Sequence, residues 1–99
     1  MVRQIILKKR FLHKLEKILV YLEDEFGLAI AQQFAKQLDA KLLTLQQQPF
    51  IGKKSVSFDG VRSIRAGKHN RLYYKIDEDK IVVLNIYDVR INPKRNKLK

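Results

Sequence analysis

The spacing of apolar residues changes at Pro49, and this change does most to limit the possible fold. Before Pro49, apolar residues recur every three or four positions, which is typical of one face of an α-helix. Two such stripes occur: Phe11, Leu15, Ile18, Leu19, Leu22 and Phe26, and then Ala31, Phe34, Ala35, Leu38, Leu42 and Leu45. Gly27 separates them and suits the left-handed backbone at a helix end, whereas Pro49 disfavours helix in the residue before it. We therefore predict two amphipathic helices that form an antiparallel hairpin.

The second half of the chain has the pattern of β-strands. Residues 71–77 alternate between polar and apolar side chains, which predicts a strand with one solvent-exposed face. Residues 81–87 are almost wholly apolar and rich in β-branched side chains, which predicts a central strand. The polar residues 77–80 between them predict a turn. Residues 55–58 and 61–66 are expected to form irregular structure or short strands.

Together these patterns predict one α+β domain that spans residues 1–99. A chain of 99 residues can bury one modest core. The short β-prone run at residues 2–7 is expected to form an edge strand, and the helical hairpin is expected to pack on a small, mainly antiparallel sheet. The basic residues 92–99 are expected to fray.

The register around the 77–80 turn decides which side chains share a face of the sheet. A two-residue loop would pair Tyr73 with Leu84, whereas a three-residue loop would pair Tyr74 with Leu84. We expect the three-residue loop, because it keeps one face apolar and the other polar. The apolar face would then share a core with the helices, made of Phe11, Leu15, Leu22, Phe34, Leu38, Leu42, Tyr74, Leu84 and Ile86. The polar face would carry His69, Arg71, Tyr73, Lys75, Asn85 and Tyr87.

Basic residues far outnumber acidic ones. The formal net charge is +11, from 21 basic and 10 acidic residues. Residues 1–50 carry eight basic and five acidic residues, a net +3, whereas residues 51–99 carry thirteen and five, a net +8. A field of this strength favours a polyanionic partner, such as nucleic acid, the ribosome or an acidic protein.

The composition also excludes several kinds of site. The chain has no cysteine, which rules out disulfides and thiolate metal sites. Its two histidines, His13 and His69, are far apart in the sequence, so we expect no metal and no cofactor. The apolar run near the N-terminus is too short for a signal peptide, and no stretch approaches the ~20 apolar residues of a membrane span. We therefore expect a cytoplasmic protein that has no membrane partner.

Two strand motifs resemble the RelE/ParE superfamily of bacterial toxins. Residues 68–76 are Lys-His-Asn-Arg-Leu-Tyr-Tyr-Lys-Ile, and residues 81–93 are Ile-Val-Val-Leu-Asn-Ile-Tyr-Asp-Val-Arg-Ile-Asn-Pro. They follow the order of that superfamily: an Arg-Leu-Tyr-Tyr-like strand, a turn, a Val/Ile-rich strand and a terminal arginine. The step Pro-Phe-Ile-Gly at residues 49–52 fits as well. The resemblance covers nearly the whole chain.

This resemblance implies the toxin of a type II toxin–antitoxin pair, which arrests growth unless a small acidic antitoxin binds it. We expect the antitoxin to cover either the basic sheet or the helix groove. One branch of the superfamily cleaves messenger RNA in the ribosomal A site, and the other poisons DNA gyrase without cutting anything itself. We expect a ribosome-dependent, metal-independent mRNA endonuclease. The alternatives are a gyrase inhibitor, which the ending at residues 90–94 favours, and a non-toxic basic RNA-binding module.

The resemblance also implies roles for residues of the polar face. Arg71 corresponds to an arginine that contacts phosphate in the RNA-cleaving branch. Arg90 matches the terminal arginine, and would either contact phosphate or position the C-terminal tail. Tyr87 or His69 would transfer protons, because cleavage needs a base for the 2′-hydroxyl and an acid for the leaving oxygen. Expected nucleic-acid contacts are Lys53, Lys54, Tyr73, Lys75 and Lys94. Each of these side chains also has a purely structural alternative, as a solvated cation or a half-buried sheet aromatic.

Overall fold

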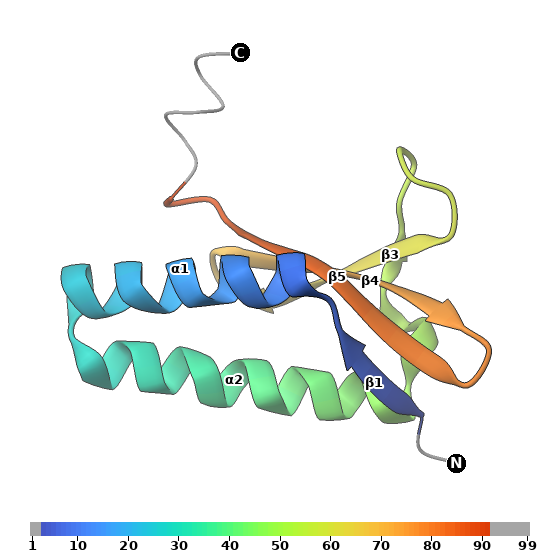
Figure 1. The fold of residues 1–99 in the computed structure, drawn as a ribbon, viewed down its shortest axis with the longest axis horizontal. Helices are drawn as coiled ribbons and strands as arrows, with labels where there is room; N and C mark the ends of the chain where they lie inside the picture. The colour runs from blue at the N-terminus through green and yellow to red at the C-terminus, as the bar shows by residue number, and fades with distance from the viewer. Residues whose placement is uncertain (1–2, 92–99) are drawn as a thin grey trace.

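A computed structural model describes residues 3–91 of the chain and shows a helical hairpin packed against a sheet (Figure 1). Within these residues the elements are β1 (Gln4–Leu7), α1 (Lys9–Phe26), α2 (Leu28–Gln47), the 3-10 turn η1 (Pro49–Ile51), β2 (Lys53–Lys54), β3 (Val61–Gly67), β4 (Asn70–Asp77) and β5 (Lys80–Asp88). The predicted α+β class is confirmed. The basic residues 92–99, expected to fray, lie outside the described residues.

The two helices begin and end where the apolar stripes predict. Gly27 joins them with φ 98° and ψ 163°, a backbone conformation that is essentially restricted to glycine. Its N–H donates to the Glu23 carbonyl at the end of α1, and α2 ends just before Pro49. The helices therefore run antiparallel and side by side (Figure 1). No helix within residues 3–91 is both long and apolar enough to cross a membrane.

The sheet formed by residues 3–91 has five strands in the order β1-β5-β4-β3-β2. The strand β5 lies between β1 and β4, which confirms the predicted central strand, and β1 is an edge strand as predicted. Because β1 pairs with β5 in the parallel direction while the other pairs are antiparallel, the sheet is mixed. A two-residue turn at Glu78 and Asp79 joins β4 to β5, with Glu78 at a positive φ of 57°.

A β-bulge in β5 corrects the predicted register. Towards the open end of the hairpin, Tyr73 lies opposite Asn85, as a three-residue loop predicts. Near the turn, Tyr74 lies opposite Val83, as a two-residue loop predicts. The register shifts between Tyr73 and Tyr74, and Leu84 is the extra residue on β5. The predicted three-residue register is thus correct for the open half of the hairpin, whereas the two-residue alternative holds near the turn. The expected pairing of Tyr74 with Leu84 is wrong.

The core lies between the helical hairpin and one face of the sheet. The helices bury Phe11, Ile18, Leu22, Ala31, Phe34, Leu38 and Leu45, and the strands bury Ala66, Leu72, Tyr74, Ile81, Val83 and Ile86. Leu15 and Leu42 are partly buried against this cluster. Leu84 was expected in the core and is not part of it, because the bulge turns its side chain to the opposite face of the sheet.

Tyr74 also fixes the chain where α2 leads into the sheet. Its buried hydroxyl donates to the Pro49 carbonyl over 2.7 Å and accepts from the Gly52 N–H over 2.9 Å. Burial raises the pKa of the Tyr74 phenol, although the Gly52 hydrogen bond and the charge of Arg62 act in the opposite direction. A side chain at Gly52 would overlap the Tyr74 ring and hydroxyl. The glycine is therefore required here by close packing.

Candidate functional site

The face of the sheet that the helices leave uncovered, here called the open face, carries most of the predicted polar surface. Residues directly opposite each other on neighbouring strands point to the same face. One row across the sheet consists of Arg65, Arg71 and Tyr87, and the next consists of Ser63, Tyr73 and Asn85. Beyond the bulge a third row consists of Val61, Lys75, Val82 and Ile6. Five of the six residues predicted for the polar face therefore lie on the open face.

Hydrogen bonds and ring contacts order the side chains of the two polar rows. A guanidinium nitrogen of Arg71 donates to the Ser63 hydroxyl over 2.8 Å. The rings of Tyr73 and Tyr87 meet edge to face, with centroids 5.6 Å apart. The amide of Asn85 donates to the Tyr87 hydroxyl over 3.1 Å. Arg71 and Tyr87 lie directly opposite each other on β4 and β5.

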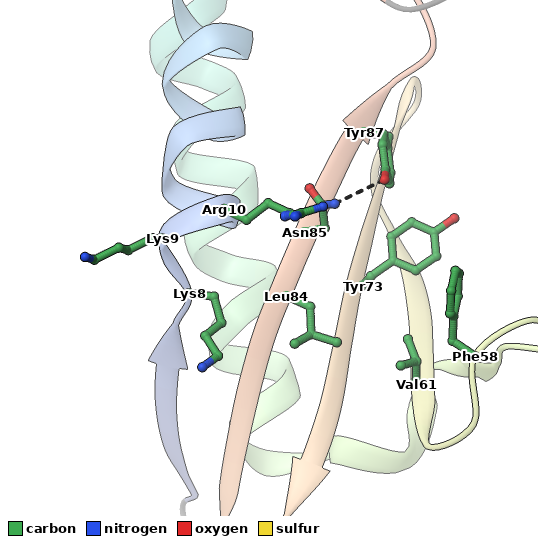
Figure 2. A pocket seen from close by; sticks show the side chains of 9 residues that line it. All are labelled: Lys8, Lys9, Arg10, Phe58, Val61, Tyr73, Leu84, Asn85 and Tyr87. Atoms are coloured by element: carbon green, nitrogen blue, oxygen red, sulfur yellow. Dashed lines mark hydrogen bonds between the residues drawn. The ribbon is translucent and has the colours of Figure 1, made fainter. Parts of the chain in front are cut away.

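A cavity of about 930 Å³ opens beside Tyr87 on the same face. Its apolar and aromatic walls come from Phe58, Val61, Tyr73, Leu84 and Tyr87, with Asn85 among them. Leu84 reaches this wall because of the bulge, and Phe58 comes from the loop between β2 and β3 (Figure 2). Neither residue was predicted to take part in a site. No feature of the sequence predicts the bulge, and Phe58 lies in a segment without clear periodicity.

Basic residues at the start of α1 form the rim of this cavity. Lys8, Lys9 and Arg10 line it, and Arg10 extends towards Asn85 whereas Lys9 points away from the strands (Figure 2). The Lys8 N–H donates to the Val83 carbonyl over 3.1 Å, which ties the start of α1 to β5. One turn later, the Lys14 ammonium lies 4.1 Å from the centroid of the Tyr87 ring. The run of three basic residues at 8–10 was visible in the sequence, but its position beside the sheet was not.

Arg90 belongs to a different cluster, at the end of β5. Asp88 is 1% exposed, and its carboxylate accepts hydrogen bonds from the Arg90 backbone N–H, from two guanidinium nitrogens of Arg90 and from the Asn70 amide, at 2.7–3.1 Å. The guanidinium carbon also lies 5.9 Å from the Tyr21 ring centroid and 5.5 Å from that of Phe26. We call these five residues the Asp88 cluster. It holds Arg90 against the end of α1.

The ionisation of this cluster follows from its contacts. Burial alone would raise the pKa of the Asp88 carboxyl, but hydrogen bonds from Arg90 and Asn70 and the Arg90 charge outweigh it and lower that pKa. The same carboxylate raises the pKa of Arg90. The pair is therefore ionised at neutral pH, and the Arg90 charge is already matched by a buried carboxylate.

The remaining predicted site residues are dispersed. His69, which is expected on the polar face, lies in the two-residue turn between β3 and β4, where its carbonyl accepts a hydrogen bond from the Val89 N–H over 3.0 Å. Lys53 and Lys54 form the short edge strand β2, at the far side of the sheet from β1. Lys94 lies outside the described residues. Within residues 3–91, no three His, Asp or Glu side chains come together in a way that could hold a metal ion.

The family of the chain is shown by comparison with known proteins. Residues 5–93 match the family described as ParE toxin of type II toxin-antitoxin system, parDE. The chain belongs to this family. The toxin has no match among curated protein sequences.

Solved structures of related proteins share the fold of the toxin. A chromosomal ParDE toxin–antitoxin system from P. aeruginosa matches with a TM-score of 0.77 and 17% identity, over 88% of the toxin and 96% of that chain. A mutant of the E. coli toxin RelE in the free state matches with a TM-score of 0.61 and 20% identity, over 97% and 93%. The toxin–antitoxin complex RelBE2 from Mycobacterium tuberculosis matches with a TM-score of 0.58 and 22% identity, over 89% and 99%.

These findings confirm the resemblance seen in the sequence. The chain is a ParE-family toxin of a type II toxin–antitoxin system, and it has the RelE/ParE fold. The fold is common to members with different targets, so the target must be argued from the toxin's own surfaces.

Proposed function

We propose that the toxin inhibits DNA gyrase by binding it and performs no chemistry of its own. The observation that carries this proposal is that Arg90, one of the four residues expected to cleave RNA, is held by the buried carboxylate of Asp88. Arg71 and Tyr87 share the open face, His69 lies in the turn between β3 and β4, and Arg90 is held in the Asp88 cluster. The match to the ParE family supports the same branch of the superfamily.

The Asp88 cluster bears directly on this argument. Cleavage of a phosphodiester without a metal needs cations aimed at the charge that develops on the phosphate. The Arg90 guanidinium makes a 2.8 Å ion pair with the Asp88 carboxylate, whose side chain has no exposed surface. Withdrawing Arg90 would leave a buried carboxylate unpaired, which is strongly unfavourable. Arg90 therefore stabilises the fold, and its charge is not available to a phosphate.

A toxin that acts by binding needs an exposed surface for its target, and the tip of the helical hairpin offers one. Leu28 is 55% exposed and Ile30 is 41% exposed, and both lie next to Gly27 at the start of α2. Exposed apolar surface marks sites of protein–protein interaction. We infer that this tip contacts gyrase.

RNA cleavage is the second candidate, and one observation favours it. Arg71 lies directly opposite Tyr87, beside the cavity on the open face. This arrangement supplies one cation and one hydroxyl within a single site, which is part of what metal-free cleavage needs. His69, the other residue expected to transfer protons, lies two residues before Arg71 in the turn between β3 and β4.

Purified toxin distinguishes the two candidates in parallel assays. In the first, the toxin is added to gyrase with relaxed plasmid and ATP, and supercoiling and covalent gyrase–DNA complexes are measured. In the second, the toxin is added to ribosomes that carry a defined messenger RNA, and new RNA ends are mapped. The proposal expects loss of supercoiling and no new RNA ends. New ends within the A-site codon, with supercoiling unchanged, would contradict it.

Variants of the hairpin tip test the inferred contact with gyrase. Leu28→Ser and Ile30→Ser should each raise the toxin concentration needed for half-inhibition by about 10-fold, the equivalent of about 1.4 kcal/mol of binding free energy. Leu43→Ser is the control, because Leu43 is 61% exposed on the same helix but lies about four turns from the tip. Equal effects of all three variants would contradict the assignment of the tip.

A further inference from the structure

We propose that the cavity on the open face receives an apolar side chain from an acidic segment of the antitoxin. The proposal rests on the identity of the chain as an antitoxin-regulated toxin, and does not depend on gyrase as the target. It chooses the sheet over the helix groove as the surface that the antitoxin covers. Three features of the cavity carry it: an aliphatic floor, a preorganised wall and a basic rim.

The floor of the cavity is aliphatic because of the β-bulge. Leu84 would point into the core in a regular strand, but the bulge turns it to the open face beside Val61. The polar atoms of Asn85 are already engaged, since its amide donates to Tyr87 and its carbonyl accepts from the Ile86 N–H over 2.9 Å. A ligand group in this cavity therefore meets mainly carbon, which suits a branched or aromatic side chain.

The wall formed by Phe58 is held in position by its own loop. The Ser55 hydroxyl accepts from the N–H groups of Ser57 and Phe58, each over 3.1 Å, and the Ser55 N–H donates to the Val61 carbonyl over 2.8 Å. Phe58 itself is 64% exposed. A loop that is ordered before binding loses less conformational entropy when a partner arrives, so this exposed ring is ready to contact a ligand.

The rim of the cavity carries positive charge without acidic groups to balance it. Lys8 and Arg10 bring positive charge to the rim, whereas Lys9 points away from the strands, and none of the described residues that line the cavity is acidic. The first turn of α1 contains no acidic residue either, and the start of a helix carries a partial positive charge. An acidic segment would therefore be attracted to the rim while its apolar side chain enters the cavity.

The same features disfavour other occupants. The toxin's own residues 92–99 contain four basic and no acidic residues, so the rim would repel them. Nucleic acid would use the aromatic rings for base stacking, but the Lys14 ammonium lies over the Tyr87 ring and the Tyr73 ring meets Tyr87 edge-on. Phe58 leaves an exposed ring for a base, but the floor of Leu84 and Val61 beside it is aliphatic and suits an apolar side chain better.

The first test measures antitoxin affinity with the cognate antitoxin as the probe. Leu84→Arg fills the cavity with a cation, and should raise the Kd of the complex at least about 10-fold. Leu43→Arg is the control, since it makes the same change at an exposed position of α2 outside the cavity, and should leave Kd within about twofold. Because an arginine at residue 84 could disturb folding, Val61→Ser provides a milder second variant, checked by its thermal midpoint. Wild-type affinity in folded Leu84→Arg and Val61→Ser would overturn the proposal.

The second test measures how the positive charge of the rim affects the rate of antitoxin association. Arg10→Glu should slow antitoxin association about 10-fold at low salt, and the difference should disappear at high salt because screening shortens the reach of charge. Lys17→Glu makes the same charge change at an exposed position of α1 away from the cavity, and should slow association less. Equal slowing by both variants would show that only the net charge matters, and would overturn the role of the rim.

A third measurement tests whether nucleic acid or the antitoxin occupies the cavity. Poly(U) is titrated against the toxin and the Leu84→Arg variant. The proposal expects the variant to lose antitoxin affinity and to keep whatever poly(U) affinity the toxin has. Loss of poly(U) binding with retained antitoxin binding would assign the cavity to nucleic acid instead. Gyrase takes no part in these experiments, so their outcome is independent of the proposed target.

Discussion

Tyr87 and Asp88 are consecutive residues of β5, yet Tyr87 is 41% exposed on the open face and Asp88 is 1% exposed on the other face. The Asp88 carboxylate accepts hydrogen bonds from Arg90 and Asn70, and the Arg90 guanidinium lies near two aromatic rings at the end of α1. The Tyr87 hydroxyl accepts one bond, from Asn85, and its ring is held by Tyr73 and Lys14. The same strand thus builds a closed charge network on one face and an accessible surface on the other.

This contrast explains why two arginines that looked alike in the sequence differ in the structure. Arg90 is paired with a buried carboxylate, whereas Arg71 contacts the neutral hydroxyl of Ser63 on the open face. The charge of Arg71 is therefore available to an anionic partner, and that of Arg90 is largely neutralised. Type and spacing of residues indicate a candidate site, but the partner of each charge decides what it can do.

The largest expected effect comes from removing the carboxylate of the Asp88 cluster. Asp88→Ala leaves the Arg90 guanidinium and the buried Asn70 amide without their acceptor, so the free energy of unfolding should fall by about 3–5 kcal/mol. Urea unfolding followed by circular dichroism measures this loss. Asp39→Ala is the control, because Asp39 is exposed on α2, and should change stability by about 0.5 kcal/mol or less. A similar small effect of Asp88→Ala would show that the network is not closed.

A second comparison tests the two faces of β5 across the bulge. Ile86 is fully buried, so Ile86→Ala should lower the free energy of unfolding by about 2–5 kcal/mol. Leu84 faces the cavity and is only partly buried, so Leu84→Ala should lower it by about 1 kcal/mol or less. Both variants are measured by the same urea titration. Equal losses would mean that Leu84 packs in the core after all and that the bulge is misplaced.

The bulge also marks the limit of what the sequence predicts. Periodicity located both helices, the turn at 77–80 and the central position of β5, because each depends on local pattern and burial. Leu84 was assigned to the core because a strand was assumed to alternate without interruption. A bulge depends on how the strand pairs with its neighbours, so no local sequence pattern predicts that Leu84 lines the open face.

The candidate site was predictable in part for a related reason. Arg71, Tyr73, Asn85 and Tyr87 were placed on one face by alternation along their own strands, and the structure agrees. The basic residues of α1 and Phe58 join that face only through tertiary packing, since they are far away in the sequence. Arg90 was recognised as a notable residue, but its pairing depends on the burial of Asp88, and burial at the end of a strand is not visible from alternation alone.

The pH dependence of the free energy of unfolding should show whether Asp88 is ionised in the folded toxin. The pKa of Asp88 is lower in the folded toxin than the value of about 3.9 for an unperturbed aspartate. Its contribution to stability is therefore fully present above about pH 4, and is lost as the pH falls through the lowered folded pKa. The stability difference between the toxin and Asp88→Asn should shrink as urea titrations are taken from pH 6 to pH 2. A difference that stays constant over this range would contradict an ionised Asp88.

The smallest expected effect on stability is on the open face, and it bears most directly on function. Tyr87→Phe keeps the ring against Tyr73 and removes one hydroxyl that accepts a single hydrogen bond, so it should lower the free energy of unfolding by about 0.5–1.5 kcal/mol. Arg71→Ala removes a partly exposed side chain, and should have a similar or smaller effect.

Because the proposed gyrase contact lies at the hairpin tip, both variants should still arrest growth when they are expressed without antitoxin. An RNA-cleaving site would instead lose about 10²–10³ in rate with Arg71→Ala, the loss typical when one stabilising donor is removed from an active site. Growth curves of induced cells, together with mapped messenger RNA ends, measure the difference. The proposal would be contradicted by loss of toxicity in both folded variants together with new RNA ends in cells that express the unmodified toxin. Toxicity would then be assigned to RNA cleavage on the open face.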